Sequence, residues 1–522
     1  MEKLYISDLG DGNFKNPILF ADYSDPDVIR VGDTFYMTAS SFNYVPGLPI
    51  LTSKDLVNWK LVNYALKNIQ FDNYDIPQHA KGVWAPAIRH HDGEFFIYYG
   101  MPDEGIFMVK TADPLGQWQE PVCVLEGKGL IDSCPFWDED GKAYIVHAYA
   151  KSRIGFKSML GIFEMSADGT KAITEDHILY NGVKTQPTIE GPKVYKRDGF
   201  YYILAPAGGV KTGWQTALRS KSIYGPFEEK IVLRQGNSPV NGPHQGGLVD
   251  TANGDEWFLH FQDRGLYGRI CHLQPVKWVD GWPVMGDEPY DEYCGTPLLS
   301  GKKPNCGAEE ELCYLQASDD FSSDKLALQW QWMGNWKEEF FSLTENPGRL
   351  RLYSLNPSGQ DKSILWYQAN VLTEKLVCPS FDCEVALDIS SLMENEQAGL
   401  VMMGGKYAYL AVKASAEKKS LILSEAFDDV DGLKERVTVL KDLPADCNFI
   451  KLGLSLMDTN GNLNFEMHYF DENDTKQKVN TSFFPSDHTW VGAKIGLFAM
   501  ALDNEKHQGF CDFDYVKVSS ND

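Results

Sequence analysis

The sequence has few basic residues, no long apolar run and almost no helical periodicity. Lys and Arg number 48 against 73 Asp and Glu, which gives a net charge of −25. A nucleic-acid binder needs a basic face to neutralise phosphates, and a protein adsorbed on anionic lipid needs basic clusters. No run of about 18 apolar residues could form a membrane-spanning helix. We therefore expect neither nucleic acid nor a membrane as a partner.

Signals for export and for catalytic metal are also missing. The N-terminus, MEKLYISDLGDG, lacks a cationic segment followed by an apolar one, so no signal peptide is expected. The ten cysteines are scattered from Cys123 to Cys511 without a CxxC pair, which favours free thiols in a reducing compartment over a disulfide scaffold. We expect a cytoplasmic protein, although a chain trimmed of its signal would look the same. Because HExxH and Cys/His ligand spacings are absent, a catalytic zinc is not expected.

What the sequence does have is aromatic residues, 13% of the chain, and a phrase repeated through its first 260 residues. The phrase is an apolar strand, a short turn with glycine and an aromatic-rich strand, which is typical of a β-hairpin. Its copies are DVIRVGDTFYMT, AIRHHDGEFFIYY, PFWDEDGKAYIVH, KVYKRDGFYYILA and GLVDTANGDEWFLHF. The turn glycines Gly32, Gly93, Gly141, Gly199 and Gly254 lie 61, 48, 58 and 55 residues apart. This spacing predicts a five-bladed β-propeller, since the strands of an ordinary sandwich would recur more tightly.

The composition changes near residue 300. The segment GDEPYDEYCGTPLLSGKKPNCGAEEE is rich in Gly, Pro and charge and is typical of a linker. After it come many short segments with period-two alternation, such as GRLRLYSL, FDCEVALDI and KIGLFAMAL. We predict an all-β chain: a propeller over residues 1–300, a linker over 301–316 and an antiparallel β-sandwich of jelly-roll type over 317–522.

Three carboxylates stand at matching places in the repeat. Asp25, Asp132 and Glu190 each lie on the segment that leads into a blade's first strand. Those positions can face one end of a propeller, where three acids would form a site for acid/base chemistry. Each residue also has a structural alternative. Asp25 precedes Pro26 in a turn, Asp132 could cap a turn with Ser133, and Glu190 could be a solvated loop acid.

The order of the motifs resembles glycoside hydrolase family 43, in particular its β-xylosidase and α-L-arabinofuranosidase members. The resemblance rests on Asp25-Pro26, VGDTFYMTASSFNYVPGLPILTSKDLVNW, GVWAPAIRHHDGEFFIYY, IDSCPFWDEDGKAYIV, IEGPKVYKRDGFYYIL and GRICHLQPVKWVDGWP. It covers roughly residues 15–290. The segment DDFSSDKLALQWQW resembles the start of the concanavalin-A-like sandwich that follows the propeller in many of those enzymes.

The resemblance implies a role for each residue. Asp25 matches the general base that activates water, Glu190 the general acid, and Asp132 the third acid that orients Glu190 and tunes its pKa. An inverting mechanism of this kind needs roughly 6.5–9.5 Å between base and acid. Trp84 and Phe42 match aromatic walls of the sugar site, and Arg269 matches an arginine at its floor. Without the resemblance, Trp84 would be a core residue and Arg269 part of a surface ion pair.

Calcium is the cofactor that the resemblance implies, because His244 matches a histidine that coordinates Ca²⁺ with water molecules; alone, it would be a turn histidine. His90 and His91 are interpreted as structural, although one of them could approach the pocket because WAPAIRHHDG enters the second blade. In the sandwich, four acids near its two ends either form a second calcium site or are solvated turn acids: Asp319, Asp320, Asp512 and Asp514. The family's sandwich often closes one side of the pocket, and Trp336, Phe340 and Phe341 are candidates for such a loop.

The resulting expectation is an exo-acting, inverting glycoside hydrolase. Its substrate would be an oligosaccharide from hemicellulose, arabinoxylan or arabinan, with terminal α-L-arabinofuranosyl or β-D-xylosyl units. The sequence departs slightly from β-xylosidase forms in SFNYVPG and HFQDRGLYGR, which favours arabinofuranose. The alternatives are a predominant β-xylosidase, a glycan-binding propeller without catalysis and a phosphorolytic enzyme acting on mannosides, which would need a basic phosphate site. An endo-arabinanase is disfavoured, because an appended sandwich usually blocks an open cleft.

Overall fold

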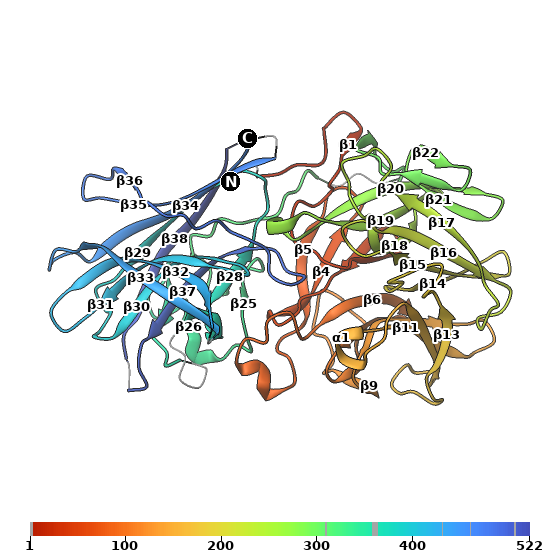
Figure 1. The fold of residues 1–522 in the computed structure, drawn as a ribbon, viewed down its shortest axis with the longest axis horizontal. Helices are drawn as coiled ribbons and strands as arrows, with labels where there is room; N and C mark the ends of the chain where they lie inside the picture. The colour runs from red at the N-terminus through yellow and green to blue at the C-terminus, as the bar shows by residue number, and fades with distance from the viewer. Residues whose placement is uncertain are drawn as a thin grey trace.

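The computed structural model describes residues 4–307, 311–357, 364–430, 432–459, 461–505 and 508–521. It confirms an all-β chain in which a five-bladed propeller is followed by a β-sandwich (Figure 1). Each blade is built on four antiparallel strands that are consecutive in sequence, and blade four carries two further strands. In every blade the first two strands are the hairpin that the repeated phrase predicts.

The blades have these bounds. Blade one holds β2 (Asp27–Val31), β3 (Thr34–Thr38), β4 (Gly47–Ser53) and β5 (Lys60–Leu66). Blade two holds β6 (Trp84–His91), β7 (Glu94–Met101), β8 (Gly105–Thr111) and β9 (Val122–Glu126). Blade three holds β10 (Leu130–Trp137), β11 (Ala143–Tyr149), β12 (Met159–Met165) and β13 (His177–Asn181). Blade four holds β14 (Lys193–Arg197), β15 (Phe200–Ala207), β16 (Trp214–Ser220) and β17 (Glu228–Arg234), extended by β23 (Cys294–Thr296) and β22 (Glu288–Asp291). Blade five holds β18 (His244–Asp250), β19 (Glu256–Asp263), β20 (Arg269–Val279) and β21 (Trp282–Met285).

The ring closes between the first and the last blade. The first strand of blade one, β2, packs against both β6 and β18. Arg30 on β2 donates through Nε to the backbone carbonyl of Asp250 at 2.9 Å. The short strand β1 (Asn13–Lys15) pairs with β24 (Ser300–Lys302), so both ends of the propeller segment are tied together. All first strands therefore surround one axis and run in the same direction along it.

The sandwich consists of two seven-stranded sheets. One sheet has β25 (Gln331–Trp332), β28 (Leu372–Lys375), β37 (Lys494–Ala501), β30 (Glu396–Met403), β31 (Ala408–Ala414), β32 (Lys419–Asp429) and β33 (Gly432–Asp442), in that order. The other has β26 (Phe341–Ser342), β27 (Leu350–Tyr353), β38 (Phe510–Ser520), β29 (Phe381–Asp388), β34 (Phe449–Thr459), β35 (Asn462–Phe470) and β36 (Lys476–Lys478). Helical segments are short: α1 (Lys151–Ile154) and the turns η1 (Asp72–Asp75), η2 (Gly265–Tyr267), η3 (Glu338–Phe340) and η4 (Leu365–Tyr367). None of the described helices is long and apolar enough to cross a membrane.

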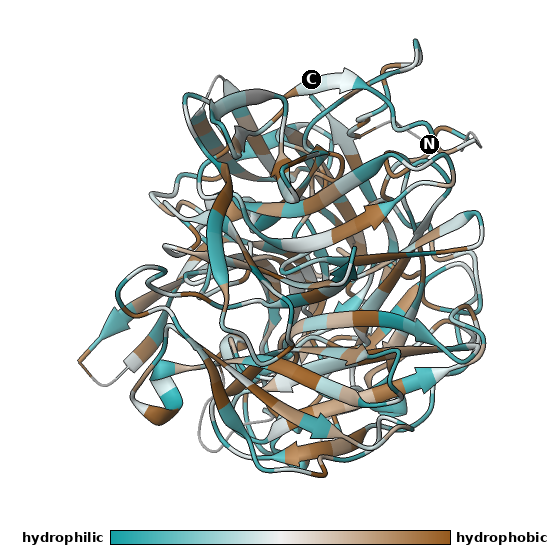
Figure 2. Ribbon diagram, turned by 90° about the vertical axis from the view of Figure 1, so that its right-hand side faces the viewer, coloured by the Kyte–Doolittle hydropathy of each residue, from teal (hydrophilic) through white to brown (hydrophobic). Residues whose placement is uncertain are grey.

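The two domains bury side chains in different patterns. Along β29 of the sandwich, buried and half-buried residues alternate strictly, because one face of the sheet meets the core and the other does not. Along β7 of the propeller every residue after Glu94 is buried, because each blade packs against a neighbour on both faces. In Figure 2 apolar and polar bands alternate along many strands. The aromatic excess in the sequence therefore serves largely to fill the space between blades.

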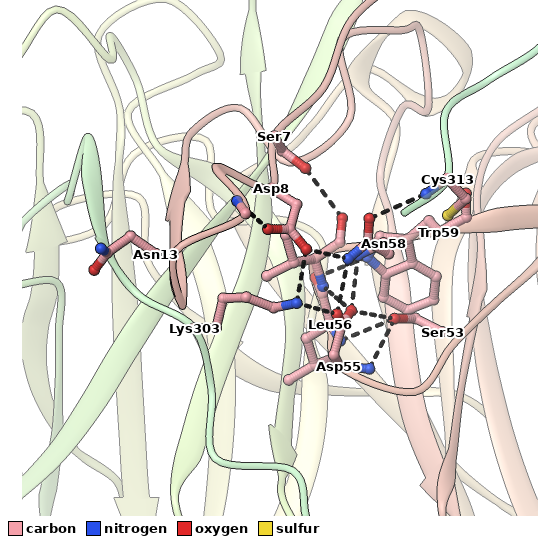
Figure 3. A network of polar contacts seen from close by, with 12 residues as sticks. Ser7, Asp8, Asn13, Ser53, Asp55, Leu56, Asn58, Trp59, Lys303 and Cys313 are labelled. Carbon is pink, nitrogen blue, oxygen red and sulfur yellow. Dashed lines mark hydrogen bonds and ion pairs between the residues drawn. The ribbon is translucent and has the colours of Figure 1, made fainter. Parts of the chain in front are cut away.

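The domains are joined by backbone pairing and by a polar clasp. Val45 and Trp332 exchange backbone hydrogen bonds across the domain boundary, at 3.0 and 2.6 Å. In the clasp (Figure 3), Lys303 Nζ contacts Asp8 Oδ2 at 2.8 Å and Asp55 Oδ2 at 2.6 Å. Cys313 N donates to Asn58 Oδ1 at 3.2 Å. Residues 303 and 313 of the predicted linker thus contact blade one, whereas Asn305 accepts hydrogen bonds from Asn253 of blade five. None of the ten cysteines, all of which lie in the described residues, forms a disulfide bond.

Candidate active site

The three acids lie at the same end of the propeller, at the starts of first strands from different blades. Asp25 precedes β2, Asp132 lies near the start of β10 and Glu190 precedes β14. Asp25 and Asp132 adopt left-handed backbone conformations, with φ of 54° and 58°. Such values are uncommon for residues other than glycine and tend to gather at functional sites. The repeat therefore brings together residues that are up to 165 positions apart in sequence.

Asp25 is held by three side chains. Arg269 Nη1 donates to Asp25 Oδ1 at 2.7 Å, and both side chains are 8% exposed. The hydroxyls of Ser40 and Ser24 donate to Oδ2 at 2.6 and 2.8 Å. The ion pair and the two hydroxyl donors fit a carboxylate in its charged form. A charged carboxylate in a fixed orientation is what a general base requires.

Asp132 holds the backbone next to Glu190. Its Oδ2 accepts a hydrogen bond from Gly191 N at 2.8 Å. Gly191 has φ of 56°, and a side chain there would collide with Gln245, so only glycine fits. Burial, together with the charges of Glu190 and Asp25, raises the pKa of Asp132 well above its ordinary range.

His244 contacts the side chain of Glu190. Its Nε2 lies 3.0 Å from Glu190 Oε1, and the histidine side chain is 1% exposed while Glu190 is 28% exposed. Nδ1 of His244 is buried without a protein partner. In the described part of the chain no group of three or more His, Cys, Asp or Glu side chains could hold a metal ion. The residues present therefore do not form a calcium cage; calcium stays a prediction in which one histidine and water molecules would hold it.

The predicted aromatic walls differ in exposure. Trp84, at the start of β6, is half-buried, and its Nε1 donates to Ala80 O at 3.1 Å. Phe42 is 4% exposed and packs with sandwich residues such as Met333 and Val401. The two rings meet edge to face, with centroids 6.5 Å apart. Trp84 can offer a ring face to a sugar, whereas Phe42 supports Trp84 from the domain interface.

One tryptophan that the sequence analysis did not single out reaches the site from the sandwich. Trp490 lies just before β37, is 44% exposed, and its ring centre is 5.3 Å from the guanidinium carbon of Arg269. The adjoining residue Gly492 donates through its backbone to Asp22 Oδ2, and Asp22 Oδ1 accepts from Arg269 N, both at 2.9 Å. Aromatic residues near the chain's end carry no sequence signal of this contact, because it forms only when the sandwich docks.

The other candidates from the sandwich lie elsewhere. The backbone N–H of Trp336 donates to Oδ1 of Asn68, in the loop after β5, at 3.0 Å, and Phe340 packs on Trp332. Phe341 packs on Trp332 and Trp336, so Trp336 ties the sandwich to the propeller while Phe340 and Phe341 pack within the sandwich.

The four sandwich acids do not gather into a metal site. Asp512 pairs with Arg351 through both oxygens, at 2.8 and 2.9 Å. Asp514 lies 3.4 Å from Arg349, and Asp319 and Asp320 accept backbone hydrogen bonds in a turn. A second calcium site among them is thus unsupported: two of the acids are neutralised by arginines and the other two serve a turn.

His90 and His91 lie at the far end of the propeller. His90 packs against Phe95, and His91 stacks on Trp137 with ring centres 4.6 Å apart. They border a cavity of about 560 Å³ at the ends of the first strands, away from the three acids. Their positions agree with a structural role.

Comparisons with known proteins agree with this architecture. The description "Glycosyl hydrolases family 43" matches residues 14–283, and "Beta xylosidase C-terminal Concanavalin A-like domain" matches residues 318–519. A β-xylosidase of Formosa agariphila is 32% identical over 97% of this chain and 90% of its own length. A non-reducing end α-L-arabinofuranosidase of Bacteroides ovatus is 31% identical over 97% of this chain and 95% of its own. The crystal structure of a family 43 protein from Bacillus licheniformis superimposes with a TM-score of 0.79, at 26% identity, over 97% of this chain and all of that one. This chain therefore belongs to glycosyl hydrolases family 43.

Proposed function

We propose that this protein is an exo-acting, inverting glycoside hydrolase that removes terminal α-L-arabinofuranosyl or β-D-xylosyl units from hemicellulose-derived oligosaccharides. The observation that carries the proposal is the meeting of Asp25, Asp132 and Glu190 from three blades, each with a different set of partners. Relatives named for each of the two activities match almost the whole chain.

In the proposed reaction Asp25 is the base and Glu190 the acid. The charged carboxylate of Asp25, fixed by Arg269, takes a proton from water as that water attacks the anomeric carbon. The bond between the anomeric carbon and the leaving oxygen breaks, and the leaving oxygen takes a proton from Glu190. One proton is accepted and one is donated, so the charge is balanced. Glu190 is the most exposed of the three acids, which suits a residue that must reach the substrate.

Two further residues support Glu190 in this scheme. Asp132 fixes the peptide that follows Glu190 through Gly191 N, and His244 contacts the carboxyl group itself. Both restrict the orientation of Glu190, and orientation of a general acid is a large part of its effect. Trp84 and Trp490 would form the aromatic walls around the sugar, and Arg269 would lie at its floor while it holds Asp25.

The choice between arabinofuranose and xylopyranose stays open to experiment. The alternative is a predominant β-xylosidase acting on xylo-oligosaccharides, which the name of the Formosa agariphila relative favours. A cytoplasmic location and Ca²⁺ beside His244 are further proposals. With one protein ligand, such an ion would be weakly held and would act electrostatically near Glu190.

Product analysis tests the proposal. Purified protein is incubated with xylohexaose, with arabinohexaose and with arabinoxylan oligosaccharides, and early products are separated by chromatography. We expect xylose or arabinose as the first product and, by proton NMR, inversion at the released anomeric centre. Oligosaccharides of intermediate length as first products would contradict exo action, and retention would contradict the roles given to Asp25 and Glu190.

A further inference from the structure

A lysine is buried next to the acids, at the start of blade four. Lys193, the first residue of β14, is 0% exposed, and within the described chain its Nζ has no hydrogen-bond partner. Asp27 Oδ1 and Gln245 Nε2 are also buried without partners. Burial of an ammonium group without a hydrogen-bonded partner is unfavourable for folding. The presence of a lysine here therefore has to be explained by the groups around it.

Two contacts between β10 and β14 place Lys193 beside Asp132. Gly191 N donates to Asp132 Oδ2 at 2.8 Å, and Val194 N lies 3.4 Å from Cys134 Sγ. Lys193 lies between these two contact points. Its positive charge lowers the pKa of Asp132, against burial and the neighbouring acids, which raise it.

Titratable groups lie on every first strand around the axis or just before it. They are Asp132 and Cys134 on β10, Asp25 before β2 and Asp27 on it, Arg89 on β6, Glu190 before β14 and Tyr195 on it, and His244 on β18. The other cations are committed elsewhere, since Arg269 binds Asp25 and Arg89 donates to Asp27 Oδ2, both at 2.7 Å. In the described part of the chain, Lys193 is the cation that remains to balance Asp132.

We propose that Lys193 is a positioning residue: its buried side chain favours the charged form of Asp132 against the burial and neighbouring acids that oppose it, and a charged Asp132 holds the Glu190–Gly191 peptide in its catalytic orientation. The inference rests on the proposed role of Glu190. A carboxylate accepts a backbone hydrogen bond more strongly than a neutral carboxyl group does. Uptake of a proton by Asp132 would weaken its hold on Gly191 N and release Glu190 from its orientation.

The first test is the pH profile of Lys193→Met, with aryl β-D-xylosides or aryl α-L-arabinofuranosides as substrates. Removing a positive charge raises the pKa of a nearby carboxyl group, so the acid limb of kcat is expected to move to higher pH by about one unit. The loss of kcat should be about tenfold or more for 4-methylphenyl glycosides and small for 2,4-dinitrophenyl glycosides, whose departure needs little acid assistance. Lys193→Arg keeps the positive charge, so its acid limb of kcat should lie at the same pH as that of wild type. Lys196→Met, three residues further along β14 and paired with Asp138, is the matched control and should not move it.

The second test does not depend on activity. Melting temperatures are compared for Lys193→Met in the wild-type background and in the Asp132→Asn background. If the side chains of Lys193 and Asp132 interact, the change in melting temperature caused by Lys193→Met should differ by about 2 °C between the wild-type and the Asp132→Asn backgrounds. An unmoved acid limb, or equal effects on melting in both backgrounds, would overturn the proposal. Lys193→Gln replaces Lys193→Met if the latter does not fold. A wild type that hydrolyses neither glycoside would refute the proposed function, while the melting comparison would still decide on Lys193.

Discussion

The imidazole of His244 lies 3.0 Å from the carboxyl group of Glu190, although 54 residues separate them in sequence. The contact links the start of blade five to the residue just before blade four. It gives His244 a role that needs no metal, namely to restrict the orientation of the proposed acid. We expect His244→Ala to lower kcat about tenfold with KM little changed, because orientation of the acid matters most in the transition state. Steady-state kinetics measure this, and a rise of KM alone would contradict it.

Calcium can be tested in the same variant by a measurement of binding. If one histidine and water hold the ion, the melting temperature of wild type should rise only at about millimolar CaCl₂. His244→Ala should lose that response. The same response in both proteins would place any calcium site elsewhere.

Asp132→Asn should stabilise the fold while it impairs catalysis. Because burial and the neighbouring acids raise the pKa of Asp132 in the folded state, folding favours its protonated form. The raised pKa therefore lowers the stability of the fold. This loss of stability is absent below the pKa of Asp132 in the unfolded chain, about 3.9, grows as pH rises above that value, and is complete above the pKa of Asp132 in the folded protein. Asparagine removes this loss. We expect a melting temperature about 2 °C higher than wild type at pH 7 and no difference near pH 3.5.

Trp490→Ala should weaken substrate binding without a loss of stability. Trp490 is 44% exposed and contributes its ring beside Arg269 from the sandwich. Loss of a sugar-stacking ring removes binding in the ground state and the transition state alike, so KM should rise by about fivefold with kcat little changed. Phe449→Ala, another exposed aromatic of the sandwich, is the control. Unchanged KM for oligosaccharides would remove Trp490 from the site.

Lys303→Met should destabilise the protein and leave the site intact. Lys303 lies between Asp8 and Asp55, and the side chain of Asp55 is 2% exposed (Figure 3). Without the lysine two neighbouring carboxylates lose their cation, which is strongly unfavourable for buried groups. We expect a melting temperature about 4 °C lower, with unchanged kcat below the transition. A stable variant would show that the clasp contributes little.

The repeated phrase predicts the propeller well because its physical basis is local. A turn with glycine between an apolar and an aromatic strand forms a hairpin wherever it occurs, and five hairpins at similar spacing leave few other folds. The same periodicity places Asp25, Asp132 and Glu190 at one end. Their partners are set by packing between blades, which is why Arg269 on Asp25 and Gly191 on Asp132 become visible only in three dimensions.

Docking of the two domains is the part that the sequence conceals. Trp336, Phe340 and Phe341 have the composition of a sugar-binding loop, yet Trp336 binds Asn68 of the propeller and the two phenylalanines pack within the sandwich, whereas Trp490 lies beside Arg269. Phe42 is buried by the same docking. Acids in the sandwich look alike in sequence, but Arg351 neutralises Asp512. Such outcomes depend on long-range contacts that no local pattern encodes.

The central claim is that Asp25 and Glu190 carry out glycoside hydrolysis, and one comparison tests it most directly. Hydrolysis of 4-nitrophenyl α-L-arabinofuranoside and 4-nitrophenyl β-D-xyloside is measured for wild type, Asp25→Asn and Glu190→Gln. Asp138→Asn, at the far end of blade three, is the control. We predict turnover of at least one glycoside by wild type and by the control, with losses of about 10²-fold or more in both active-site variants. Full activity in Asp25→Asn, or no turnover by wild type, would contradict the account and favour a propeller that binds glycans without cleaving them.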